Sequence, residues 1–114
     1  MTTKRIKLNY LMLLMMALIT STAIAHDFEV DGIYYKKNSD NTTVTVTYRG
    51  SSAIAYSNEY KGDVNIPETV TYGGMTYSVI KIGTYAFDNC DELTSVTIPN
   101  SVKTIDDGAF NECI

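Results

Sequence analysis

The spacing of hydrophobic and polar positions changes near residue 80. From Phe28 to about Ile80, apolar and β-branched residues alternate with polar ones, as in VTVTY (Val44–Tyr48). A period of two is typical of strands with one buried face. Turn-forming residues separate these runs, and the pair Gly73-Gly74 predicts a two-residue hairpin. We therefore predict a small antiparallel β unit in this region.

From Ile82 onward the apolar positions repeat. Four of them return at one constant offset: Ile82, Ala86, Phe87 and Cys90 as Ile105, Ala109, Phe110 and Cys113. A weaker echo links VNIPETV (64–70) to VTIPNSV (96–102), at a larger offset. The excess over the repeat period is about the length of the glycine hairpin, which we interpret as an insertion into the first repeat.

A unit of this length cannot bury its own apolar side, but stacked copies form a continuous core. We expect a short strand from Leu93 that ends at Pro99, and a helical or 3-10 turn from Thr84 to Asn89. The predicted repeat core is Ile82, Ala86, Phe87, Cys90, Leu93, Val96, Ile98, Val102, Ile105, Ala109, Phe110 and Cys113. The outward positions Thr94, Ser95 and Thr97 form the candidate binding surface.

The segment IGTYAFDNCDELTSVTIPNSVKTI (82–105), followed by AFNEC, resembles the BspA-type leucine-rich repeat. One departure is Asp106, which stands where Gly83 stands in the first copy, so the two turns are open to different conformations. The resemblance implies a leucine-rich repeat solenoid at the surface of a host-associated bacterium. It also implies adhesion to host or bacterial surface proteins, with glycans as a further option.

The N-terminal residues read as a signal peptide. A basic start is followed by the apolar run Leu8–Ile19 and by the small residues Ala23-Ile24-Ala25. The run is short for a membrane span, so no stable span is expected after cleavage. We expect passage through the periplasm to the cell surface or the extracellular space.

The predicted organisation has three parts. Residues 1–25 are the signal peptide, residues 26–63 a β-rich lead-in, and residues 64–114 the start of the solenoid, about one and a half repeats. The hairpin insertion is placed near residues 71–80. The fold class is mainly β, with short strands and short helical or 3-10 turns.

The net charge of the chain limits the class of partner that it can bind. Residues 1–25 hold three of the nine Lys and Arg and none of the thirteen Asp and Glu, so the remaining chain has a net charge of −7. A nucleic-acid partner is not expected, because phosphate binding needs clustered basic residues.

Cys90 and Cys113 invite a disulfide in an exported chain, and adjacent coils bring equivalent positions within bridging range. We favour buried thiols, because both sit among inward apolar positions. The acidic pairs Asp91-Glu92 and Asp106-Asp107 do not fit calcium-loop spacing. No metal and no cofactor is predicted.

No catalytic motif is present, and the one histidine, His26, would lie at the mature terminus. We predict a protein that is not an enzyme. The many tyrosines between residues 34 and 85 suit either recognition or packing, and we favour packing.

The sequence stops before the strand half of the second copy, which we interpret as the N-terminal piece of a longer array. Self-association through the open end of the last coil is a further option. The leading hypothesis is an exported adhesion protein. The alternatives are a β-rich carbohydrate-binding module with the repeats as a spacer, and a truncated product without a function of its own.

Overall fold

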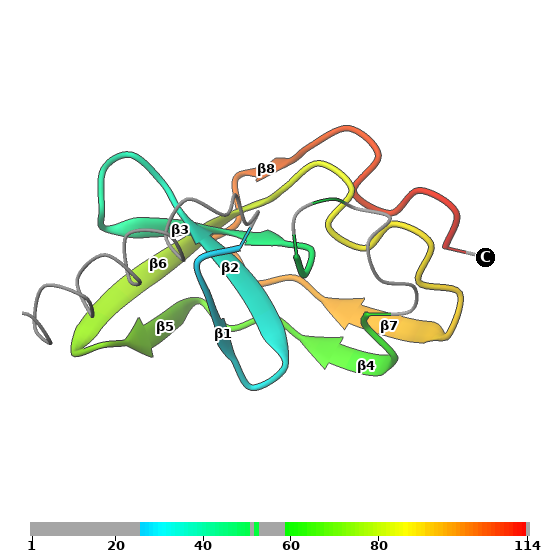
Figure 1. Ribbon diagram of the computed structural model, residues 1–114, viewed down its shortest axis with the longest axis horizontal. Helices are drawn as coiled ribbons and strands as arrows, with labels where there is room; N and C mark the ends of the chain where they lie inside the picture. Colours follow the sequence, from blue (N-terminus) through cyan, green and yellow to red (C-terminus); the bar gives the residue numbers. More distant parts are fainter. Residues whose placement is uncertain (1–25, 51, 53–58, 114) are drawn as a thin grey trace, which may run out of the picture.

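A computed structural model describes residues 26–50, 52 and 59–113. These residues form eight strands and no helix, which confirms the mainly β prediction (Figure 1). The signal peptide expected at residues 1–25 lies outside the described residues.

Six strands build the larger sheet, in the order β1-β2-β3-β6-β5 with β8 also paired to β6. The first three, β1 (Phe28–Val30), β2 (Ile33–Lys37) and β3 (Thr43–Thr47), form an antiparallel meander. β5 (Thr69–Tyr72) and β6 (Met75–Ile82) form an antiparallel hairpin around Gly73-Gly74. Both glycines have positive φ, as a type I′ turn requires.

The meander and the hairpin join through a parallel pairing of β3 with β6. The expected antiparallel unit is therefore a mixed sheet. β6 is long enough to pair with β5 over its first half and with β8 (Thr104–Ile105) over its last two residues. Val46, Ile82 and Ile105 consequently lie side by side on three parallel strands.

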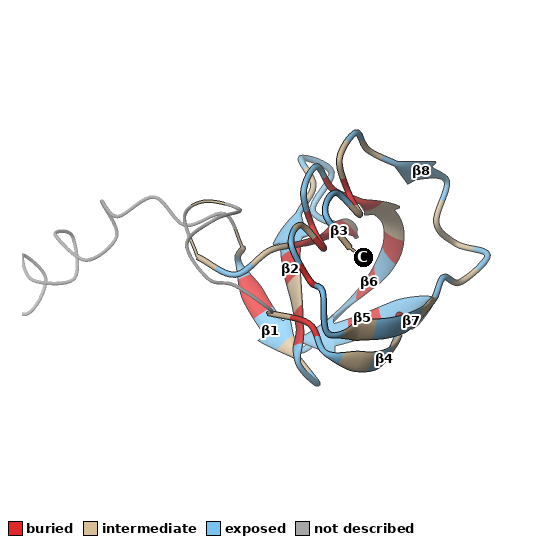
Figure 2. Ribbon diagram, turned by 90° about the vertical axis from the view of Figure 1, so that its right-hand side faces the viewer, coloured by how far each residue is buried: buried red, intermediate tan, exposed pale blue. Residues whose placement is uncertain are grey.

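A second, two-stranded sheet consists of β4 (Gly62–Asn65) and β7 (Leu93–Thr97), which run parallel. Seen along the long axis, the two sheets and the turns that connect them surround one interior (Figure 2). The buried hydrophobic residues form one cluster. The core draws on every part of the described chain: Phe28, Tyr35, Val44, Val46, Tyr60, Val70, Val79, Ile82, Phe87 and Cys90 are among its members.

Candidate functional site

The two copies of the repeat lie directly on each other. The N–H of Phe87 donates to the carbonyl of Ala109 (2.7 Å), and the N–H of Asn89 donates to that of Asn111 (2.9 Å). The rings of Phe87 and Phe110 stack with centroids 5.1 Å apart and an interplanar angle of 3°. Equivalent residues thus form continuous rows across the coils.

The predicted core residues are buried to different extents. Ile82, Ala86, Phe87, Cys90 and Ala109 are buried, and Leu93, Val96, Val102, Phe110 and Cys113 are half-buried.

The expectation of a buried position does not hold for Ile98 and Ile105, whose exposed fractions are 38% and 50%. Both belong to the outer coil, which contains β7 and β8. No strand of the described residues pairs with β8 on the side away from β6, so a large part of Ile105 contacts solvent.

The expected helical turn at residues 84–89 is not observed. The segment is a chain of tight turns, with the N–H of Ala86 bonded to the carbonyl of Gly83 and that of Asp88 to that of Tyr85. Tyr85 and Asn89 have positive φ values of 57° and 55°, which a right-handed helix excludes. The same left-handed positions recur in the next copy, at Gly108 and Glu112.

Gly83 and Asp106 begin turns of the same kind, although their side chains differ. The N–H of Ala86 bonds to Gly83 at 3.1 Å, and that of Ala109 bonds to Asp106 at 3.2 Å. Glycine is needed at position 83 for space: a Cβ there would lie 3.0 Å from Thr45 Cγ2 and 3.1 Å from the Val46 carbonyl oxygen. The absence of a side chain at position 83 therefore allows β3 to pack closely, and the turn itself does not require glycine.

The candidate binding surface lies on β7, where Thr94, Ser95 and Thr97 are all exposed. Two of the three hydroxyls are engaged: Thr94 and Ser95 both donate to Asp63 Oδ1 on β4, at 2.8 and 2.6 Å. These bonds stabilise the carboxylate and lower the pKa of Asp63. A register shift between Gly62 and Asp63 accompanies this arrangement.

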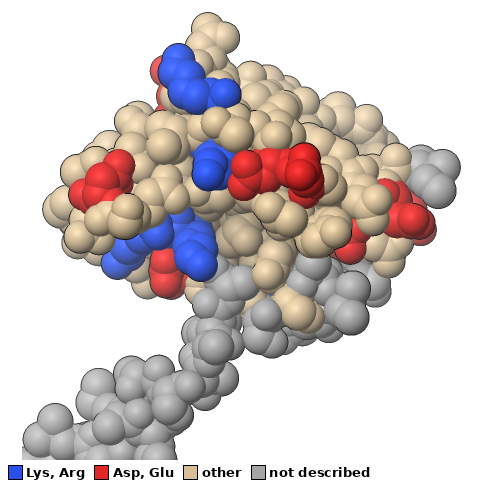
Figure 3. Space-filling model, turned by 90° about the horizontal axis from the view of Figure 1, so that it is seen from above, with Lys and Arg blue, Asp and Glu red and all other residues tan. Residues whose placement is uncertain are grey.

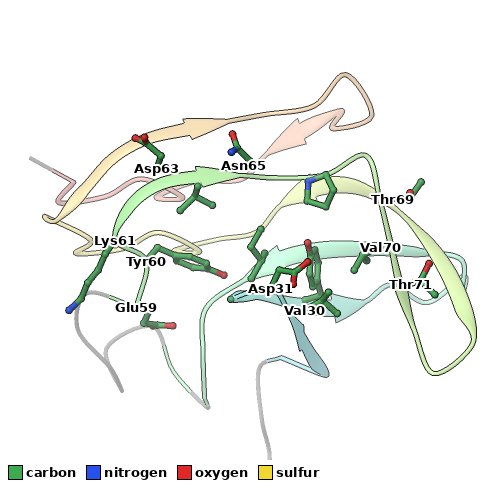
Figure 4. A pocket seen from close by; sticks show the side chains of 15 residues that line it. Val30, Asp31, Glu59, Tyr60, Lys61, Asp63, Asn65, Thr69, Val70 and Thr71 are labelled. Carbon is green, nitrogen blue, oxygen red and sulfur yellow. The ribbon is translucent and has the colours of Figure 1, made fainter.

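A cavity of about 760 Å³ lies between the β1–β2 turn and the segment from β4 to β5 (Figure 4). Its lining combines buried apolar residues with carboxylates: Val30, Asp31, Gly32, Ile33, Tyr35, Glu59, Tyr60, Lys61, Asp63, Val64, Asn65, Pro67, Thr69, Val70 and Thr71. Burial, with a smaller contribution from the charge of Asp31, raises the pKa of Tyr35 to about 12. Apolar residues such as Ile33 and Val70 thus share the lining of this groove with Asp31, Glu59 and Asp63, which we call the acidic rim.

Tyr60 ties the lead-in to the first coil at one end of the cavity. Its hydroxyl donates to the Thr47 carbonyl (2.7 Å) and accepts from the Tyr34 N–H (3.0 Å), while its ring lies 4.5 Å from that of Phe87. Burial raises the pKa of Tyr60 well above its usual value. No local pattern marks this tyrosine, among so many, for the bridging position.

The other tyrosines divide between packing and exposure. Tyr35 and Tyr77 are buried, Tyr34 and Tyr48 half-buried, and Tyr72 and Tyr85 exposed. Tyr72 stacks on Phe28 with ring centroids 4.4 Å apart. Tyr56 lies outside the described residues.

Both cysteines are free thiols. Cys90 is buried, which raises its pKa, and Cys113 is half-buried with its thiol donating to the Phe87 carbonyl at 2.7 Å. Within residues 26–50, 52 and 59–113, no three acidic, His or Cys side chains come together in a way that could hold a metal ion.

One residue of the acidic rim, Asp31, lies in a turn that the sequence does indicate. Asp31-Gly32 between two strand-like runs is a strong hairpin signal, and both residues have positive φ. The pairing of Asp63 with Thr94 and Ser95 had no such signal, because it depends on the register of two strands that lie far apart in the sequence.

The face seen from above carries acidic and basic side chains in small groups, some of which touch each other (Figure 3). In the described part of the chain, no helix has the length and apolar character to cross a membrane.

The solved structures that resemble this chain include two crystal structures. A leucine-rich repeat protein from Bacteroides ovatus ATCC 8483 is 34% identical over 77% of this chain, with a TM-score of 0.65. A leucine rich cell surface protein from Faecalibacterium prausnitzii A2-165 is 33% identical over 75% of it, with a TM-score of 0.59. The match covers 21% of each of those chains, so this chain spans about a fifth of their length.

A search of curated proteins found no match. Residues 69–114, which contain the stacked coils, match the family described as "BspA type Leucine rich repeat region (6 copies)". With its stacked repeat coils, the region 69–114 therefore belongs to the BspA-type leucine-rich repeat family.

Proposed function

We propose that this chain is an exported, non-enzymatic leucine-rich repeat protein that binds surface proteins of a host or of other bacteria. Its family indicates a protein-interaction role. The word "surface" in the name of the Faecalibacterium relative supports a location at the cell surface.

The observation that carries the proposal is the outward face of the β4–β7 sheet. The register sets Asp63 beside Ser95 and Asn65 beside Thr97, so small polar side chains from successive coils form one exposed face. Repeat proteins bind through such continuous faces, because each further coil extends the same rows. Thr94, Ser95 and Thr97 are its members on β7.

The test is adhesion of cells that display the full chain to immobilised extracellular matrix proteins and to other bacterial cells. We expect Thr97→Arg to weaken adhesion, because a long charged side chain would cover the face. Thr104→Arg is the matched control, since Thr104 is also an exposed strand threonine but lies on β8. Equal adhesion of both variants and the unaltered chain would exclude this face as the binding surface.

The carbohydrate-binding alternative requires exposed aromatic rings. Tyr35, Tyr60 and Tyr77 are buried and offer no stacking platform. Tyr72 and Tyr85 are exposed, but one face of Tyr72 already stacks on Phe28. We therefore keep protein binding as the proposed function.

A further inference from the structure

One edge of β4 has no strand partner among the described residues, because β4 pairs only with β7. The N–H groups of Gly62 and Ile66 donate to the Glu92 and Thr97 carbonyls, both at 3.0 Å. Successive residues of a strand direct their N–H and C=O groups to opposite edges. Asp63 and Asn65 therefore direct theirs away from β7. Such a row of edge groups is a template for another strand.

This free edge borders the cavity. Asp63, Val64 and Asn65 line one side of it, and the β1–β2 turn lies on the other (Figure 4). Along β4, Val64 is half-buried and packs against the core, whereas Asp63 and Asn65 are exposed. A segment laid beside β4 would alternate in the same way, with every second side chain over the apolar lining and the others at the rim.

The rim is acidic. Asp31 and Glu59 line the cavity together with Lys61, and the Glu59 carboxylate accepts a hydrogen bond from the Arg49 N–H. The third carboxylate, from Asp63, lies on the outward side of β4, where Thr94 and Ser95 donate to it (Figure 4). The Lys61 Nζ already lies 3.5 Å from a Glu92 carboxylate oxygen. The Ser95 and Thr94 hydroxyls lower the pKa of Asp63.

This charge distinguishes between possible occupants. Pairing the β4 edges of two copies would bring like charges together, which is unfavourable between neighbouring strands. A basic segment has the opposite, complementary charge.

We propose that the free edge of β4 and the adjoining groove bind an extended peptide in which apolar and basic residues alternate. The peptide backbone bonds to Asp63 and Asn65, its apolar side chains lie over Ile33 and Val70, and its basic side chains lie beside Asp63 on the outward side of β4. The strand β4 extends about 13 Å, which matches a peptide segment of the same length. The site is an edge and a groove. It shares Asp63 and Asn65 with the outward face proposed for adhesion, and differs from that face because a peptide backbone pairs with the β4 edge.

The probe is a fluorescent hexapeptide of alternating valine and lysine, capped at both ends and titrated into the full chain. We expect saturable binding that weakens with salt. The same peptide with glutamate in place of lysine should not bind. Equal binding of the glutamate peptide would overturn the proposal.

Two N-methylated peptides test the backbone pairing. One is methylated at every valine and the other at every lysine, so each loses the donors on one edge. A parallel complex uses the valine donors and an antiparallel complex uses the lysine donors, because the opposed side chains share a face. We expect one of the two peptides to bind about tenfold more weakly, from two or more lost hydrogen bonds, and the other to bind within about twofold of the parent. Equal affinities of the two peptides would contradict strand pairing.

Protein variants locate the site. Asp31→Asn retains a residue that tolerates positive φ while removing one rim charge, and Asp63→Asn removes another. Each should weaken binding by about two- to fivefold at low salt. Asn65→Pro removes an edge donor and should weaken it further, with its thermal unfolding measured alongside. Thr104→Asn on β8 is the control.

The remaining outcomes are also decisive. Competition by a neutral oligosaccharide, with no binding of the lysine peptide, would assign the groove to a glycan and overturn the proposal. A dimer of the unaltered chain that Asn65→Pro abolishes would assign the edge to a second copy and overturn it equally. Unchanged peptide binding in all three groove variants would place the peptide elsewhere.

Discussion

The ring of Tyr85 lies against Gly108, the residue that occupies the same position in the next coil. A Cβ at position 108 would come within 2.4 Å of Tyr85 Cε1 and 2.7 Å of Cδ1. Both residues have positive φ, 57° for Tyr85 and 68° for Gly108. The backbone shape is thus repeated while the side chain is not, because the ring from one coil uses the space that glycine leaves in the other.

We expect Gly108→Ala to lower the free energy of unfolding by about 1–2 kcal/mol, mainly from the left-handed backbone of an L residue. Urea unfolding measures the change. The double variant Tyr85→Ala with Gly108→Ala separates the two causes: if the ring contact contributes, the alanine at 108 will cost less in the absence of the ring. Full stability of the single variant would contradict both.

Gly83→Ala should also destabilise the protein, but through packing. Its φ is not in the left-handed region, and its Cβ would press on Thr45 Cγ2 and the Val46 carbonyl. Overpacking of a buried site costs about 1–3 kcal/mol. Thr45→Ser removes the Cγ2 methyl and keeps the hydroxyl that donates to Asn38. In that background we expect a smaller loss from Gly83→Ala, and an identical loss would show that the carbonyl contact dominates.

Tyr60→Phe should lower the free energy of unfolding by about 1–3 kcal/mol, because the substitution leaves the Thr47 carbonyl and the Tyr34 N–H without their hydroxyl partner in a buried site. Urea unfolding again measures the change. Tyr48→Phe is a matched control, because Tyr48 is only half-buried. Comparable losses in the two variants would argue against the bridging role of Tyr60.

Alkaline pH should destabilise the protein, because Tyr35 and Tyr60 have raised pKa values in the folded state. The folded pKa of Tyr35 is raised to about 12 and that of Tyr60 is raised well above its ordinary value, so both stay neutral when folded. A raised folded pKa gives stability that is complete below the unfolded value, near 10, and lost as the pH rises towards the folded value. We expect the urea midpoint to fall above about pH 10, and to fall less steeply in Tyr60→Phe.

The two thiols should react at different rates. Cys113 is half-buried, whereas Cys90 is buried with a raised pKa, and the thiolate is the reactive form. Under native conditions an aromatic disulfide reagent should modify Cys113 first. Cys90→Ser and Cys113→Ser variants identify the phases. Simultaneous loss of both thiols would point to a disulfide formed between them.

The repeated residues allowed part of the fold to be predicted from the sequence. The return of Ala86 and Phe87 as Ala109 and Phe110 predicted which residues stack, because identical side chains at a fixed spacing pack identically. The conformation of the turn was not predictable in this way, since Tyr85 and Glu112 adopt positive φ values that their residue types rarely favour. The groove depends on how β4 lies against the β1–β2 turn, a long-range relationship that local patterns do not encode.

The parallel pairing of β3 with β6 has a consequence for how the chain folds. The β1–β2–β3 meander and the β5–β6 hairpin each close through short turns, whereas Val46 meets Ile82 only after the whole intervening chain has been brought together. Long loops close late, because their entropy is lost before any contact compensates for it. We expect two locally formed pieces that dock in a slow final step. Substitutions at Val46 should therefore slow folding more than substitutions in either turn.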